Sequence, residues 1–508
     1  MYLFILVSSL VIVFYLVWNF QWRYRGYWKN QGIPEVRRKG SSLKEMVSIM
    51  WTNQGSHAKF VKMYNENPGV SMVGFYQVGR PALLVREPGI IKDIMLVEFP
   101  KFRENLDVLD PKNNRLLFRN PFFSRDHIWK NSRKRLTNAF SSSRLKTMTE
   151  DLRKISGKMD DYLLKKLEGK REIELELKDL FSRFTGEFVA NAGFGIEGYC
   201  FHGDKHPGSF HELGKIMFAP KSYGILDYLL QLFPVLQNIP RVSFLPEEVD
   251  RFFMRTTKGV LDMRMSESSK RLDFFQLMLD LESSKDGTVD VHAVASNLLT
   301  FFFDGYETAA ITLSFVGYHL AEHPEVQERL RKEVKDSLSK CGSMTYECLT
   351  EMTYMDQVIH ESLRMKTTFG GFVKICTEST VLKGSDGLSC RVEPGTFIAI
   401  SNTALHKDPS YWKDPEVFDP SRFDPSVKSS IPKFTFLPFG EGPRICIGMR
   451  VGLLSAKAAL FAILNNYSLE PSPRTQLPFR MDTNAFMLSP IGGIWARLKP
   501  LDKSNGPR

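Results

Sequence analysis

The sequence predicts a mainly α-helical protein with small β-sheets, which is an α+β fold class. Of its 508 residues, 43% are hydrophobic and 25% are charged, so the chain can bury a large core and is not disordered. From about Asp126 to Phe423, most long segments repeat apolar residues at helical spacing and carry charged faces. Strand-like segments such as SMVGFYQVG and PALLV are short and precede this region. Helices should therefore form most of the body, accompanied by small sheets.

The first twenty residues are apolar over a length that could cross a bilayer. Met1–Phe20 contains no charged side chain, and twenty helical residues span about 30 Å, the thickness of a hydrocarbon core. Trp18 and Trp22 lie where interfacial aromatic residues are typical, and basic residues follow the segment but do not precede it. We expect a transmembrane signal anchor over residues 1–20 and a basic linker over 21–33, with the bulk of the chain on the cytosolic side. The alternative, a cleaved signal peptide, lacks its usual basic start and A-x-A cleavage site.

The remainder reads as one domain over residues 34–501 and a polar tail over 502–508. No internal repeat and no low-complexity linker divides it. The net charge of +11 is spread thinly, which argues against nucleic-acid binding and favours an acidic partner or anionic lipid. A last apolar helix is expected from about Met449 to Asn465. The chain should then end in a hairpin, with NAFMLSP and GIWARLKP on either side of a turn at Pro490–Gly493.

One of the six cysteines stands out by its surroundings. The six form no CxxC pair, so neither a disulfide framework nor a structural zinc site is expected. Cys446 lies in the segment FGEGPRICIG, where two glycines and a proline make a tight turn that can approach a flat ligand. The start of the apolar helix that follows favours a thiolate, and Arg444 is placed to meet a carboxylate. Such a thiolate suits an axial ligand of haem iron. The alternative is a structural cysteine after a glycine-rich turn.

A polar notch interrupts an apolar helical segment. In FFFDGYETAAITLSF, Asp304, Glu307 and Thr308 are spaced to share one face of a helix that runs from about Ala293 to Leu330, as one helix or two abutting ones. Burying two carboxylates is costly unless they are hydrogen-bonded or hydrated, and Thr308 can bond back to the preceding turn and open the helix locally. We interpret the notch as a groove for water and a small ligand. A silent kink in a core helix is the alternative.

These two segments resemble the signatures of cytochromes P450. Residues 439–448 match the pattern F-x-x-G-x-R-x-C-x-G at every fixed position, and residues 304–308 resemble the small-Gly-x-acid-Thr motif of the oxygen-binding helix. The resemblance implies the cytochrome P450 fold and haem b (iron protoporphyrin IX), with Cys446 as the metal ligand and Phe439 and Arg444 beside the cofactor.

The same resemblance implies roles for the polar notch. Glu307 and Thr308 would relay protons to dioxygen as the catalytic residues. Asp304 departs from the usual Ala or Gly at its position. It could alter proton delivery, pair with a basic group of a substrate, or point away from the haem and do neither.

Further motifs follow in the order typical of the family. Trp129 and Arg133 match the W-x-x-x-R of a helix that meets a haem propionate, and at this spacing they share a face. Lys374 falls where many relatives have a second propionate-binding arginine, for which it offers a point charge without bidentate geometry. The scaffold motif E-x-x-R is present at Glu361–Arg364, and Arg422 occupies the place of the P-E-R-F arginine. The resemblance implies that these three form a buried network behind the cysteine loop.

The resemblance covers nearly the whole chain and is strongest to microsomal members, insect ones especially. It implies a membrane-anchored haem-thiolate monooxygenase of the endoplasmic reticulum that inserts one oxygen atom of dioxygen into a lipophilic xenobiotic, lipid or steroid. No flavin or nicotinamide fingerprint occurs in the chain, so electrons should come from NADPH through NADPH–cytochrome P450 reductase, with cytochrome b5 as an optional second donor. Candidate residues for a basic docking patch are Lys130, Lys134, Arg135 and Arg450.

Two other functions remain open at this point. A haem-thiolate isomerase or dehydratase would need no reductase, and a non-enzymatic haem sensor or lipid-binding protein on the same fold would need no proton relay.

Overall fold

The computed structural model describes most of the chain. The described residues are 24, 26–36, 56–77, 80–105, 109–203, 206, 208–219, 244–266, 273–283, 288–482 and 487–501. The expected anchor (1–20), residues 21–23 and 25 of the linker and the tail (502–508) lie outside them. Among the described helices, none is both long enough and apolar enough to cross a membrane.

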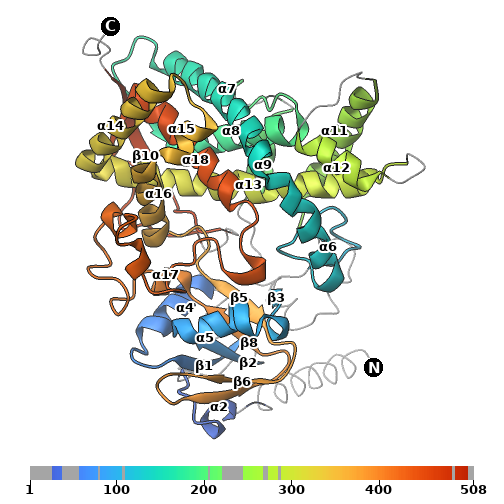
Figure 1. Cartoon of the computed structure of the whole chain (residues 1–508), viewed down its shortest axis with the longest axis vertical. Coiled ribbons are helices and arrows are strands. Elements are labelled where there is room, and N and C mark those ends of the chain that lie inside the picture. Colours follow the sequence, from blue (N-terminus) through green and yellow to red (C-terminus); the bar gives the residue numbers. More distant parts are fainter. Residues whose placement is uncertain are drawn as a thin grey trace, which may run out of the picture.

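Helices make up the upper part of the molecule as drawn in Figure 1, and α13 (Val291–Glu322) runs through its middle. The other long helices are α6 (Asp126–Thr137), α7 (Ser142–Leu167), α8 (Leu177–Phe188), α9 (Phe210–Met217), α11 (Glu247–Ser266), α12 (Phe274–Glu282), α14 (Pro324–Cys341), α16 (Thr353–Met365) and α18 (Met449–Asn466). The remaining helices are α2 (Tyr27–Asn30), α4 (Ser56–Asn65), α5 (Pro88–Lys92), α15 (Tyr346–Glu351) and α17 (Asn402–Leu405). The expected segment from 293 to 330 is therefore two abutting helices, because Pro324 cannot continue α13 but suits the first turn of α14.

Small sheets form the lower part in Figure 1. A five-stranded sheet has the order β1 (Met72–Gln77), β2 (Arg80–Val85), β8 (Phe397–Ile400), β5 (Phe372–Ile375) and β3 (Glu104–Asn105). Only the β2–β8 pair of this sheet is parallel. A two-stranded ribbon pairs β6 (Thr380–Lys383) with β7 (Ser389–Val392). The mixture of helices and small sheets confirms the predicted α+β class.

The last strand does not form the expected hairpin. β10 (Trp495–Pro500) lies between β4 (Ile173–Glu176) and β9 (Tyr467–Pro471) and pairs antiparallel with both. Residues 483–486 of the segment before the turn lie outside the described part, and its described end pairs with residues 480–482 instead, through a bridge between Met481 and Pro490. The prediction was wrong because strand partners were chosen by closeness in the sequence, whereas β10 finds its partners through tertiary packing.

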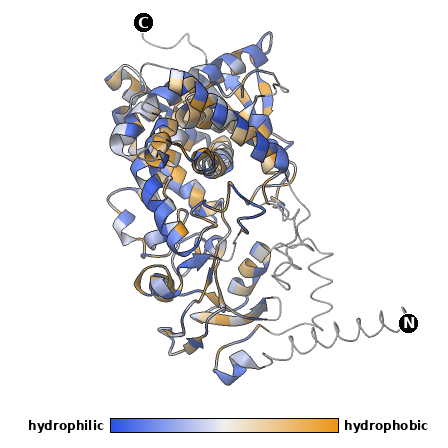
Figure 2. Cartoon of the chain, turned by 90° about the vertical axis from the view of Figure 1, so that its right-hand side faces the viewer, coloured by the Kyte–Doolittle hydropathy of each residue, from blue (hydrophilic) through white to orange (hydrophobic). Residues whose placement is uncertain are grey.

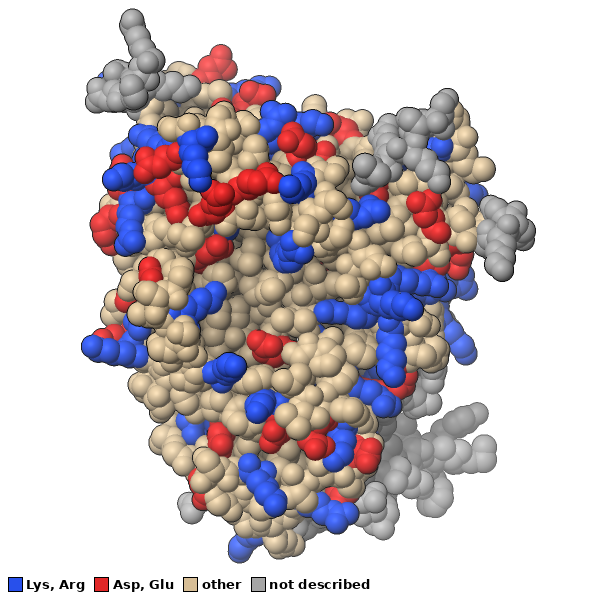
Figure 3. Space-filling model, viewed as in Figure 1, with Lys and Arg blue, Asp and Glu red and all other residues tan. Residues whose placement is uncertain are grey.

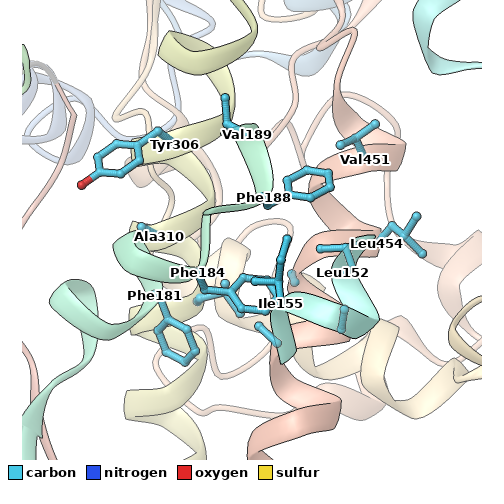
Figure 4. Packing of buried hydrophobic residues seen from close by; sticks show 14 of the residues in the cluster. Leu152, Ile155, Phe181, Phe184, Phe188, Val189, Tyr306, Ala310, Val451 and Leu454 are labelled. Carbon is cyan, nitrogen blue, oxygen red and sulfur yellow. The ribbon is translucent and has the colours of Figure 1, made fainter. Parts of the chain in front are cut away.

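The larger of two apolar cores surrounds α13. Figure 2 looks along α13 and shows it among the other helices. Side chains from α7, α8, α13 and α18 meet in this core, as Figure 4 shows for Ile155, Phe184, Ala310 and Leu454. A smaller core joins the five-stranded sheet to α4 and α5. The chain between these two cores includes the cysteine loop, so the loop is supported from both sides.

Candidate active site

The cysteine loop is a tight turn that places Cys446 just before α18. A single turn of 3-10 helix over Gly442–Arg444 precedes Cys446, and α18 begins three residues later. The amide of Cys446 donates to the carbonyl of Phe439 at 2.8 Å. Gly442 has a φ of +71°, and a Cβ there would lie 1.9 Å from the carbonyl oxygen of Met95. Only glycine therefore fits at this close approach.

Cys446 has solvent-accessible surface, but protein atoms surround its thiol. This enclosure raises the pKa of the thiol to about 11. The charge of Asp304 raises that pKa further, while the amide of Gly448 and Arg133 lower it. The helix start alone therefore does not produce a thiolate, contrary to the sequence-based expectation. A bound metal ion supplies the positive charge that deprotonates a coordinating thiol.

A single stripe of α13 is not buried. Between residues 293 and 317, all of which the structure describes, every residue is buried except five. These five are Asp304, Gly305, Thr308, Ala309 and Thr312. Their spacing places them on one face of the helix, and we call them the open stripe. Because the charge of Asp304 raises the pKa of the Cys446 thiol, the open stripe and the thiol lie near each other. This arrangement suits a flat ligand on the thiol and a second molecule beside the helix.

Thr308 lies on the open stripe, and Glu307 does not. The Thr308 hydroxyl donates to the carbonyl of Asp304 at 2.5 Å, which is the local back-bond expected from the sequence. The carboxylate of Glu307 turns toward α8, where its Oε1 lies 2.5 Å from Nζ of Lys178. Burial raises the pKa of Glu307, and Lys178 opposes that rise. The expectation that Asp304, Glu307 and Thr308 share one face is therefore corrected for Glu307.

Asn120 holds Asp304 in place. Its Nδ2 donates to Oδ1 of Asp304 at 3.0 Å, and its own Oδ1 accepts from the amide of Phe122 at 2.7 Å. Burial raises the pKa of Asp304 to about 7, and the hydrogen bond from Asn120 opposes this. Of the three possibilities raised for Asp304, its partial exposure on the stripe that also carries Thr308 favours the two in which it acts at the site. No sequence motif pointed to Asn120, because it lies 184 positions from Asp304.

Two arginines lie around the cysteine loop without an acidic partner. Arg133 donates to the carbonyl of Ile445 at 2.5 Å. Arg444 donates to the carbonyls of Arg103, Pro121 and Ser124 at 2.5, 2.7 and 3.0 Å. Its guanidinium also lies over the ring of Trp129, 4.6 Å from the centroid, so the structure brings together residues predicted from separate motifs. Burial lowers the pKa of both arginines, that of Arg444 to about 10.

Lys374 is a third buried cation in this region. It is 3% exposed, and its ammonium donates to Oδ1 of Asn105 at 2.8 Å. Burial lowers its pKa to about 7, and the charge of Arg444 contributes to that fall. Among the described residues, none of Arg133, Arg444 and Lys374 forms an ion pair with a carboxylate. Buried cations without counter-charges are costly, so this set fits a ligand that brings its own carboxylates, as haem b does with its two propionates.

The scaffold motif forms a buried network, as expected. Glu361 and Arg364 are fully buried and joined by two hydrogen bonds of 2.7 and 2.8 Å. Arg422 approaches the same carboxylate at 3.3 Å. Arg364 also donates to the carbonyl of His406, and Nε2 of His406 accepts from the amide of Leu437 at 2.8 Å. The network therefore fixes the chain where the cysteine loop begins.

Comparisons with known proteins agree with this geometry. A family model described as Cytochrome P450 matches residues 39–496. Cytochrome P450 6a2 of Drosophila melanogaster is 30% identical over 98% of this chain and 99% of its own length. Probable cytochrome P450 6w1 of the same species is 31% identical over 94% of this chain and 93% of its own. Cytochrome P450 9e2 of Blattella germanica is 29% identical over 97% of both chains. The insect-type relatives predicted from the sequence are thus confirmed.

Proposed function

This chain belongs to the cytochrome P450 family of haem b monooxygenases, and from that premise we propose that it is anchored in the endoplasmic reticulum and oxygenates a lipophilic small molecule. Electrons would come from NADPH through NADPH–cytochrome P450 reductase, with cytochrome b5 as an optional second donor. The observation that carries this proposal is that Cys446 lies near the open stripe, while Arg133, Arg444 and Lys374 around the cysteine loop form no ion pair with a carboxylate of the described residues. The apolar segment at residues 1–20 supports the membrane anchor.

The residues around Cys446 suit the binding of haem. Cys446 would hold the iron, and Arg133, Arg444 and Lys374 would hold the propionates, with Trp129 packed against Arg444. Bound there, haem b supplies the activation of dioxygen, which a thiolate ligand favours. The loop at Phe439 would close against the flat face of the cofactor.

The walls near Asp304 suit an apolar substrate. Phe122 and Phe369 stack with ring centroids 5.9 Å apart, and Phe123 packs against Phe303 and Phe244 at 5.6 and 5.5 Å. Aromatic side chains of this kind exclude water and bury large apolar area on a ligand. The substrate class that we propose is therefore a lipophilic xenobiotic, lipid or steroid.

Thr308 and Glu307 are placed to handle protons on two sides of α13. The Thr308 hydroxyl on the open stripe would hold a water or a proton donor beside the reacting dioxygen. Glu307 contacts Lys178, whose side chain is 30% exposed. This ion pair would therefore connect the buried carboxylate of Glu307 to solvent. We propose that the two residues act as successive parts of one proton path rather than as a pair on one face.

Thr308→Ala is expected to leave NADPH consumption within about threefold of wild type while lowering product formed per NADPH by about tenfold. The physical reason is that the variant keeps α13 and the cysteine loop but loses the hydroxyl that holds the proton donor. The loss is smaller than the ~10²–10⁴-fold typical of a general acid or base, because Thr308 positions the donor and does not itself supply the proton. Product and peroxide are measured against NADPH in the same reaction. Ser314→Ala is the matched control, because Ser314 makes the same back-bond, to Ala310 at 2.6 Å, but is buried away from the stripe. Unchanged coupling in Thr308→Ala would end the proposed role.

Basic side chains gather over α6, in the region where Figure 3 shows a cluster of Lys and Arg. Lys130 and Lys134 are exposed, and the structure gives neither of them an ion pair. Arg135 contacts Glu282, and Arg450 donates to Ser142 and Tyr346. We therefore propose Lys130 and Lys134 as the main contacts for an acidic face of the reductase, with Arg135 and Arg450 contributing less.

The double change Lys130→Glu and Lys134→Glu is expected to raise the KM for reductase by about tenfold at low salt. The increase should shrink as salt is added, because steering between exposed charges is screened. Reductase titrations at two ionic strengths measure it. Lys332→Glu with Lys335→Glu is the matched control on α14, which lies on the other side of the molecule in Figure 1. Equal effects of both double changes would show that only net charge matters.

The experiment that tests the proposed function is turnover of a panel of lipophilic compounds by the full-length protein with reductase. We expect oxygenated products that require NADPH, dioxygen and reductase together. Turnover that proceeds without NADPH and reductase would instead support a haem-thiolate isomerase or dehydratase. Haem binding without turnover of any kind would support a sensor or lipid-binding protein.

A further inference from the structure

Asp304 is the one acidic residue of the open stripe, all five members of which the structure describes. It stands beside Gly305 and one turn before Thr308, so its side chain borders the space in which a substrate would lie next to dioxygen. Its charge raises the pKa of the Cys446 thiol, so the two groups lie near each other. Any substrate held between the open stripe and a haem at Cys446 would therefore pass close to this carboxyl group.

The contact with Asn120 uses only part of what Asp304 can accept. Asn120 is fully buried, and its Oδ1 is occupied by the amide of Phe122. Its amide nitrogen is therefore the group turned to Asp304, and it donates to Oδ1. The structure gives Oδ2 of Asp304 no hydrogen-bond donor among the described residues. A carboxylate can accept several hydrogen bonds, so acceptor capacity remains free on the side of the open stripe.

No described cation neutralises Asp304. The three buried cations around the cysteine loop bind carbonyls and the Asn105 side chain, where they suit the propionates of haem. Arg119, next to Asn120 in the sequence, lies 3.8 Å from Asp290 instead. Asp304 is partly exposed, but the surrounding protein raises its pKa, and a carboxylate held there without a counter-charge pays a desolvation penalty. A ligand that brings a positive charge would offset this penalty, and a neutral ligand would not.

We propose that Asp304 selects, among lipophilic substrates, those that carry a cationic ammonium group. The carboxylate would hold the ammonium beside the open stripe, and the aromatic walls at Phe122 and Phe369 would take the apolar body. This inference rests on the proposed function, because it assigns a substrate class to the same site. It makes Asp304 a specificity-determining residue that contacts the substrate.

The test compares two ligands of the same shape on the haem-loaded full-length protein. The cationic probe is 4-phenylbutyltrimethylammonium, whose quaternary nitrogen has no lone pair with which to bind iron. The neutral probe is 5,5-dimethylhexylbenzene, in which a tert-butyl group replaces the trimethylammonium. Equilibrium dialysis measures both affinities. Asp304→Asn is expected to weaken the affinity for the ammonium probe by about tenfold or more, because one partner of a charge pair is lost. The affinity for the neutral probe should change by less than about twofold.

Two further variants keep the result interpretable. Glu322→Gln removes one negative charge from an exposed position near the end of α13 and should leave both affinities unchanged. Asp304→Ala repeats the test with a smaller side chain, so it decides the matter if Asp304→Asn fails to retain haem. Equal changes for the two probes in the Asp304 variants, or an equal loss of ammonium binding in Glu322→Gln, would overturn the inference. If the inference fails while the protein still holds thiolate-bound haem, the proposed function stands. If the wild-type protein itself lacks thiolate-bound haem, the proposed function is overturned.

Discussion

Cys446→Ser is expected to reduce NADPH-dependent product formation to background. A serine hydroxyl cannot supply the electron density that a thiolate donates to haem iron, and no other described cysteine lies in a comparable glycine-rich turn. Product is measured with reductase and NADPH at wild-type haem concentration, so that loss of haem and loss of chemistry can be separated. Because Ser has nearly the shape of Cys, the loop itself should keep its hydrogen bond to Phe439.

Cys348→Ser is the matched control for this prediction. Cys348 is also buried, and its thiol donates to the carbonyl of Ser337 at 3.7 Å and lies beside Cys341, in the region of α14 and α15. We expect this variant to retain activity within about twofold, since one weak hydrogen bond replaces another. Reductase-dependent turnover by Cys446→Ser at a rate near that of the control would contradict the assignment of Cys446.

Glu361→Ala is expected to destabilise the folded protein by about 3–5 kcal/mol, the typical cost of removing one partner from a buried charge pair. Arg364 would remain fully buried without its acid, and Arg422 would lose the same partner. Since Arg364 also holds the carbonyl of His406, the start of the cysteine loop should loosen as well. The midpoint of urea unfolding, followed by haem absorbance and by far-UV circular dichroism, measures the change.

An exposed ion pair provides the control for Glu361→Ala. Glu416 lies 2.7 Å from Lys407, but its side chain is 72% exposed, so Glu416→Ala should cost less than about 1 kcal/mol. If both variants unfolded at the same urea concentration, the buried network would not have the stabilising role that we assign to it. If haem absorbance were lost well before helicity in Glu361→Ala, the network would act mainly on the loop.

Local patterns were sufficient to predict the fold class and the loop. Two glycines, a proline and a cysteine in ten residues define the turn at Cys446 because its geometry depends on backbone conformations that few residues adopt. The motifs at Trp129, Arg133 and Arg444 were predicted separately, and the structure places Arg444 over Trp129. The sequence left open whether residues 293–330 form one helix or two, and Pro324 marks the boundary between α13 and α14.

The sequence alone could not predict which way side chains point or which residues far apart in the chain come into contact. With 3.6 residues per turn, Glu307 and Thr308 point about 100° apart, and spacing alone could not tell which of them shares the open face with Asp304. The choice depends on Lys178, which draws Glu307 toward α8. Asn120 was missed for a similar reason, since its contact with Asp304 exists only after the chain has folded.

The measurement that tests the central claim most directly is the carbon monoxide difference spectrum of the reduced full-length protein. Thiolate ligation of haem by Cys446 predicts a red-shifted Soret band that Cys348→Ser retains and Cys446→Ser loses. A well-folded protein that binds haem but lacks this band, or a band that persists in Cys446→Ser, would contradict the claim.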